Sequence, residues 1–216
     1  MKKYKAALFD FDGTMADTNS LILESWQTVY RALWGHEEEE EKILETFGEP
    51  LYDTVKRVFP ELNPDEVVAI YRGHMNTIYE KRIEAFPEMI ELMEELKRRG
   101  YLIGIVTSRM KGQTLIGLEK FGIAELVDSL ITCEDTDIHK PNPEPALMCL
   151  DELGVEATEA LMVGDSILDI ACAHNAGVDA ALVSWTVTLK DKELKGADAP
   201  DYIIDEAMGL LRILEG

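Results

Sequence analysis

The chain has 216 residues, 46% of them hydrophobic, and a formal net charge of -21 at pH 7. That length accommodates one domain, or a core domain with an inserted second one. The negative charge argues against nucleic acid or an anionic membrane as a partner, and no apolar run approaches the length of a membrane span. Cys133, Cys149 and Cys172 lack the paired spacing of a zinc site, so we expect reduced thiols in a cytoplasmic protein.

The first predicted element is a short buried strand at residues 6–9, followed directly by the motif DFDGT at residues 10–14. Asp10 and Asp12 point to the same side if the strand geometry continues, and their charges repel unless a cation lies between them. Mg²⁺ prefers such oxygen ligands and is typically completed by a substrate phosphate. The alternative is a turn with two solvated acids.

The next segment, residues 19–83, is predicted to be helical. Its apolar side chains recur with a helical period and it contains no convincing strand pattern. We therefore expect a small helical domain inserted after the first strand, which divides the chain into a core of residues 1–17 and 85–216 and an insert of residues 18–84. The run of five acids at residues 37–41 is expected to be solvated and not a metal site.

Beyond residue 85, apolar strand-like runs alternate with helical patterns. The predicted strands cover residues 101–107, 127–132, 160–163, 178–183 and 202–204, and the predicted helices cover residues 88–99, 113–121, 145–153 and 167–175. This alternation predicts an α/β protein with a parallel sheet covered by helices on both faces. Ligands of such folds bind at the carboxyl ends of the strands, where Asp10, Thr107 and Asp165 are expected to lie.

Three further segments could carry chemistry. Thr107 and Ser108 follow the most apolar strand and could donate to a phosphate, although such a pair is most often only a turn. Lys140, fixed before Pro141, could neutralise a carboxylate and a phosphoryl oxygen, or it could be an exposed lysine at the start of a helix.

The last segment is the motif GDSILD at residues 164–169. Asp165 falls at a strand end, beside the position of a metal held by Asp10, and Asp169 lies one helical turn further on. Ser166 is also a plausible helix N-cap, and both interpretations can hold together.

Together these segments resemble the four motifs of the haloacid dehalogenase superfamily. The first motif is residues 10–14, the second Thr107 with Ser108, the third Lys140 with the following proline, and the fourth residues 164–166 with Asp169. The resemblance covers the whole chain and implies a Rossmann-like, doubly wound core with an α-helical cap inserted between the first two motifs. Within the superfamily the chain looks most like the phosphoglycolate phosphatases and related pyrophosphatases. The chain departs from the common pattern at residues 15–18 and at Ser108, which is often Asn.

The resemblance implies a reaction and a role for each motif residue. Asp10 is the expected nucleophile, forming an aspartyl-phosphate, and Asp12 the general acid and base. Mg²⁺ is the expected cofactor, held by Asp10, by Asp165 and by the main-chain carbonyl of Asp12. Thr107 and Lys140 are expected to position and neutralise the phosphoryl group, while Ser166 and Asp169 support the metal site and the lysine from behind.

The expected partner is a small phosphorylated molecule, and the substrate-contacting residues are predicted to be Gly13, Thr14, Ser108, Arg109 and Glu49. Glu49 lies in a segment, residues 46–51, that resembles the substrate loop of the cap. A glutamate there disfavours a leaving group with a carboxylate unless a basic residue intervenes.

We expect a phosphatase for a phosphoglycolate-like monoester. Pyrophosphate hydrolysis, a phosphomutase of the β-phosphoglucomutase kind and a catalytically silent module remain alternatives. A monomer is the default expectation, with a dimer left open.

Overall fold

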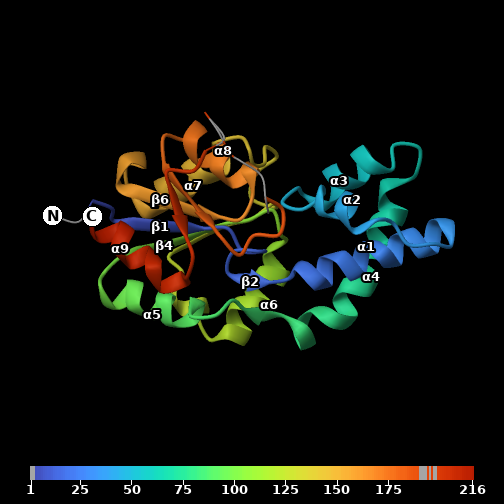
Figure 1. The fold of residues 1–216 in the computed structure, drawn as a ribbon, viewed down its shortest axis with the longest axis horizontal. Coiled ribbons are helices and arrows are strands. Elements are labelled where there is room, and N and C mark those ends of the chain that lie inside the picture. Colours follow the sequence, from blue (N-terminus) through green and yellow to red (C-terminus); the bar gives the residue numbers. More distant parts are fainter. Residues whose placement is uncertain (1–2, 190–193, 195, 197–198) are drawn as a thin grey trace.

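The structure is a computed structural model that describes residues 3–189, 194, 196 and 199–216 (Figure 1). Within these residues, six parallel strands form one sheet in the order β5-β4-β1-β6-β7-β8. The strands are β1 (Ala6–Phe9), β4 (Leu102–Val106), β5 (Ser129–Ile131), β6 (Ala160–Gly164), β7 (Asp179–Val183) and β8 (Tyr202–Ile204). The chain builds the sheet outward from β1 on one side and then crosses back to build the other side. Strand order therefore reverses at β1, which is where open α/β sheets bind ligands.

Helices cover both faces of the sheet, as the apolar strands predict (Figure 1). Side chains alternate along β1, so Ala7 and Phe9 enter one apolar core and Ala6 and Leu8 enter the other. The first core is closed by α5 (Met89–Arg98) and α9 (Leu210–Glu215), the second by α7 (Glu144–Leu153) and α8 (Ile167–Asn175). α6 (Lys111–Phe121) contributes Leu118 to the first core. The predicted α/β fold and its strands are confirmed, with the ends of several strands one or two residues shorter than expected.

Between β1 and α5 the chain forms the helical segment that lies apart from the sheet in Figure 1. It consists of α1 (Asn19–Trp34), α2 (Glu40–Leu44), α3 (Leu51–Val58) and α4 (Pro64–Arg82), and its fully described residues 19–83 contain no strand. Its core is aromatic: the Trp26 ring lies 4.9 Å from Tyr71 and 6.0 Å from Phe59, measured between centroids. We call residues 18–84 the cap; this division of the chain into domains stays a prediction.

Two very short strands join the cap to the sheet and were not predicted. β2 (Ala16–Asp17) and β3 (Glu84–Ala85) pair antiparallel where the chain leaves and re-enters the core. Two residues are too few to show a strand period in the sequence. The helix predicted at residues 88–99 begins one residue later, as α5 at Met89, because Glu88 has a left-handed φ of 61°. None of the helices in the described part of the chain is long and apolar enough to cross a membrane.

Candidate active site

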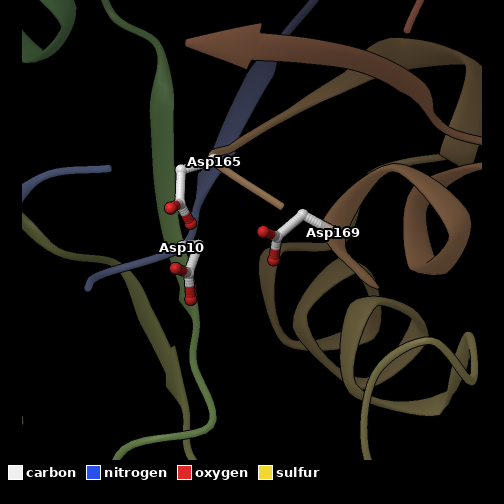
Figure 2. A group of neighbouring side chains, drawn as sticks. All are labelled: Asp10, Asp165 and Asp169. Atoms are coloured by element: carbon white, nitrogen blue, oxygen red, sulfur yellow. The ribbon is translucent and has the colours of Figure 1, made fainter. Parts of the chain in front are cut away.

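The carboxyl ends of β1, β4 and β6 bring together the acids and the hydroxyl predicted from the sequence. Asp10 directly follows β1, and its backbone N–H donates to Val163 O of β6 at 2.9 Å. Asp165 follows β6, and Asp169 reaches toward both from the first turn of α8 (Figure 2). Oxygen atoms of the three buried carboxylates lie within 4.8 Å of one another.

Lys140 is the cation between two of these carboxylates. Its Nζ donates to Asp10 Oδ1 at 2.7 Å, to Asp169 Oδ1 at 2.6 Å and to Val106 O at 3.2 Å. The residue is only 6% exposed, which excludes the alternative of a solvated lysine. A buried ammonium is tolerated only with such partners, so the position of Lys140 depends on both acids.

Both carboxylate oxygens of Asp169 already accept hydrogen bonds from the protein. Its Oδ1 accepts from Lys140, and its Oδ2 accepts from the backbone N–H and the hydroxyl of Ser166 at 3.0 and 2.6 Å. Ser166 is the N-cap of α8 and forms a capping box with Asp169. The prediction that Ser166 is a helix N-cap is therefore confirmed. Ser166 orients Asp169, and Asp169 in turn holds the Lys140 ammonium.

Asp165 is different, because its carboxylate has no hydrogen-bond or ion-pair partner in the described part of the chain although it is only 5% exposed. Burial, and then the charges of Asp169 and Asp10, raise the pKa of Asp165 well above its ordinary value. A buried carboxylate without a partner is costly. A divalent cation between Asp10 and Asp165 would remove that cost, so the residues present fit a metal.

The turn after β1 leaves room for this arrangement only because of a glycine. Gly13 has φ +75°, and a Cβ built on it would lie 2.4 Å from Asp165 Oδ2. The glycine is thus required both by its left-handed conformation and by the close approach of the carboxylate.

Burial also raises the pKa of Asp10, to about 7, against the lowering effect of the Lys140 ammonium. The nearby charges of Asp169 and Asp12 act in the same direction as burial. Additional positive charge at this site would favour the ionised carboxylate that a nucleophile requires.

Asp12 turns away from the carboxylate cluster. Thr18 Oγ1 donates to Asp12 Oδ1 at 2.6 Å, and Arg109 Nε donates to Asp12 Oδ2 at 2.6 Å. Arg109 is buried, donates to Gln113 Oε1 at 3.0 Å and lies over the Tyr79 ring, 4.7 Å from its centroid. With both oxygens held, Asp12 has a fixed orientation at the pocket.

A pocket of about 210 Å³ lies between the sheet and the cap. Asp10, Asp12, Thr107, Ser108 and Arg109 line its core side, and residues of α3, α4 and the loop before α3 line its cap side. Ser108 Oγ donates to Gly48 O at 2.8 Å, so the cap loop is in direct contact with the second motif. The Thr107 hydroxyl accepts from the Arg109 backbone N–H at 3.1 Å, which leaves its own proton for another acceptor.

The remaining predicted substrate residues lie in different surroundings. Glu49 lines the pocket, but its Oε2 accepts from Arg57 Nη2 at 2.9 Å and from the Thr54 hydroxyl at 3.1 Å. Arg57 therefore compensates the negative charge of Glu49. Thr14 is fully buried, and the described lining of the pocket includes neither it nor Gly13.

Sequence reasoning missed Thr18 and Arg72. The Thr18 hydroxyl donates to Asp12, whereas the sequence places Thr18 only at the start of the insert and gives it no role. Arg72 lines the pocket from α4, within a helical pattern that does not reveal which face meets the core. Neither residue lies in a motif, so no local signal could have identified them.

Comparison with known proteins gives a consistent result. A family model described as haloacid dehalogenase-like hydrolase matches residues 7–183. The chain is 34% identical to the pyrophosphatase PpaX of Bacillus velezensis over 98% of its own length and 97% of that protein. A crystal structure from Bacteroides fragilis, assigned as a haloacid dehalogenase-like hydrolase, superposes with a TM-score of 0.84 at 26% identity, covering 96% of this chain and 100% of that one. One from Lactobacillus plantarum, assigned as a phosphoglycolate phosphatase, has a TM-score of 0.82 at 25% identity, covering 98% and 99%.

Proposed function

The chain belongs to the haloacid dehalogenase-like hydrolase family, and we propose that this family phosphatase is Mg²⁺-dependent and hydrolyses a small phosphomonoester through a phosphorylated Asp10. One observation carries the proposal: the Asp10 carboxylate lies at a pocket, held by Lys140 at 2.7 Å and beside the unpartnered carboxylate of Asp165. A carboxylate, a fixed ammonium and a place for a divalent cation are what phosphoryl transfer needs.

The first half of the reaction transfers the phosphoryl group to the protein. An Asp10 oxygen attacks phosphorus as the bond to the leaving oxygen breaks, and Asp12 gives that oxygen a proton. Thr18 and Arg109 hold Asp12 in one orientation for this transfer. Lys140 offsets negative charge at Asp10, and the Thr107 hydroxyl donates to a phosphoryl oxygen.

The second half releases phosphate. Asp12, now a carboxylate, takes a proton from water, the water oxygen attacks phosphorus, and the bond to Asp10 breaks. Asp10, Asp165 and the main-chain carbonyl of Asp12 would hold Mg²⁺, which when bound supplies positive charge against the repulsion between Asp10 and an anionic substrate. The contact between Ser108 and the cap loop supports a closed pocket that excludes bulk water.

The substrate we propose is a small phosphomonoester of the phosphoglycolate type. A pocket of about 210 Å³ suits a small molecule, and the compensation of Glu49 by Arg57 lifts the objection to an anionic leaving group. Inorganic pyrophosphate is the second candidate, favoured by the 34% identity to a pyrophosphatase over nearly the whole chain.

Phosphate release from a panel of compounds tests the function. The panel holds 2-phosphoglycolate, pyrophosphate, p-nitrophenyl phosphate, sugar phosphates and nucleotides, each with Mg²⁺, with EDTA and with the Asp10→Asn variant. We expect metal-dependent release that Asp10→Asn lowers by at least about 10³-fold. Activity of a folded Asp10→Asn variant, or equal activity in EDTA, would contradict the proposal.

A further inference from the structure

Arg72 is the one arginine among the described residues that forms no ion pair with a carboxylate. The chain carries 42 acidic and 21 basic residues, so partners are plentiful. Each of the other arginines contacts an Asp or a Glu: Arg31, Arg57, Arg82, Arg98, Arg99, Arg109 and Arg212. An arginine left without a carboxylate in so acidic a chain has its guanidinium donors available to a ligand.

The guanidinium of Arg72 is held at the pocket. Arg72 extends from α4 and lines the cap side, with its Cζ 5.6 Å from the centroid of the Tyr52 ring. The Tyr52 hydroxyl donates to Asp65 Oδ1 at 2.8 Å, which fixes the ring beneath the arginine. Across the pocket, burial raises the pKa of the Cys133 thiol and the positive charge of Arg72 opposes that effect. Arg72 and Cys133 line the same pocket, Arg72 from the cap side and Cys133 from the core side.

Three acidic residues of the pocket are paired with basic residues of the protein. Asp10 is paired with Lys140, Asp12 with Arg109, and Glu49 with Arg57. Of the remaining lining residues, Asp53 is exposed and lies beyond ion-pair distance of Arg72. Among the residues that the structure describes, the pocket thus presents one guanidinium without a carboxylate partner; it lies on the cap side, whereas the nucleophile lies on the core side.

We infer that Arg72 binds a second anionic group of the substrate while Asp10 attacks the phosphoryl group. The substrate is then a small molecule with negative charge at both ends, whose leaving group carries a carboxylate or a phosphate. Simple alkyl, aryl or sugar monophosphates lack that second charge. This inference rests on the proposed function, and it assigns the choice of substrate class to a residue of the cap.

Steady-state kinetics of Arg72→Gln test the inference, with Arg82→Gln as the matched control. Arg82 lies on the same helix, and its replacement by Gln removes the same charge. Its Nη1 lies 2.6 Å from Glu24 Oε2, and it is not among the described residues that line the pocket. The substrates are 2-phosphoglycolate and pyrophosphate, with charged leaving groups, and p-nitrophenyl phosphate and glycerol 2-phosphate, without a second charge. We expect Arg72→Gln to lower kcat/KM for the wild type's preferred charged substrate by about 10- to 100-fold, mainly through KM.

For the two esters without a second anionic group we expect Arg72→Gln to stay within about threefold of wild type, and Arg82→Gln to do so for every substrate. Arg72→Lys should recover part of the loss, because it restores the charge without the planar fork. A larger loss of kcat/KM for 2-phosphoglycolate indicates that Arg72 binds a carboxylate. A larger loss for pyrophosphate indicates that it binds a phosphate.

Two results would overturn the inference and leave the phosphatase intact. One is an equal loss for all four substrates in Arg72→Gln, which indicates a structural role. The other is a wild type that hydrolyses only the esters without a second anionic group. Absence of hydrolysis of every compound by the folded wild type would instead remove the proposed function, and the inference with it.

Discussion

Arg109 Nε lies 2.6 Å from Asp12 Oδ2, and the buried guanidinium rests on the ring of Tyr79. The arginine that follows the second motif thus holds the acid of the first motif, almost a hundred residues earlier in the chain. The sequence suggests Arg109 as a substrate contact, whereas this geometry favours a residue that positions the general acid.

Replacing Arg109 by Gln separates these two roles. If Arg109 positions Asp12, kcat falls by about 10²-fold while KM stays within about threefold, because proton transfer depends on the orientation of the acid. Thr18→Val, which removes the other hydrogen bond to Asp12, should shift kcat in the same direction. A rise in KM at unchanged kcat would show that Arg109 binds substrate.

Gly13→Ala should damage the metal site specifically. Its Cβ would lie 2.4 Å from Asp165 Oδ2, so the carboxylate must move. Gly35→Ala is the matched control: Gly35 has nearly the same φ, +74°, but nothing within 4 Å of a built Cβ. Both variants should lose about 1 kcal/mol of stability from the left-handed backbone. Only Gly13→Ala should weaken Mg²⁺ binding, measured by calorimetry, by more than about tenfold; equal binding in both would refute this.

Without metal, the protein should become less stable as the pH rises from about 5 to 7. Burial raises the pKa of Asp10 to about 7 and that of Asp165 above its ordinary value, so the folded state holds protons that the unfolded chain has already released. Raising the pH through this window therefore favours the unfolded chain. Melting temperatures in EDTA at several pH values measure the effect.

Mg²⁺ should flatten that dependence, because it stabilises the ionised carboxylates. Asp165→Asn should flatten it in EDTA and remove the response to Mg²⁺. A melting temperature in EDTA that rises between pH 5 and 7 would contradict the assignment.

Lys140→Met should be strongly destabilising, by about 3 to 5 kcal/mol at pH 8, since it leaves the buried carboxylates of Asp10 and Asp169 without their cation. Urea unfolding measures the loss. The double variant Lys140→Met, Asp169→Asn should recover part of it, because one of the two unpaired charges is then removed. If the double variant is less stable than the single one, the two residues do not act as a pair.

Much of the core was predictable because its signals are local. The six strands of the sheet are apolar runs bounded by turns, and buried parallel strands require that composition. The short pair β2 and β3 could not be predicted, since each strand has two residues and exists only because the two chain crossings lie side by side.

The α/β fold, the helical insert and the side chains at strand ends follow from the order of residues, because strand and helix periods depend on neighbouring residues. Which charges pair depends on the three-dimensional arrangement of the chain. Lys140 could have been solvated, and no sequence pattern pairs Arg109 with Asp12, but each lies within 3 Å of a carboxylate that follows β1. That Arg72 has no carboxylate partner among the described residues is likewise visible only in the structure. Pairing depends on distances between segments, and the order of residues does not contain those distances.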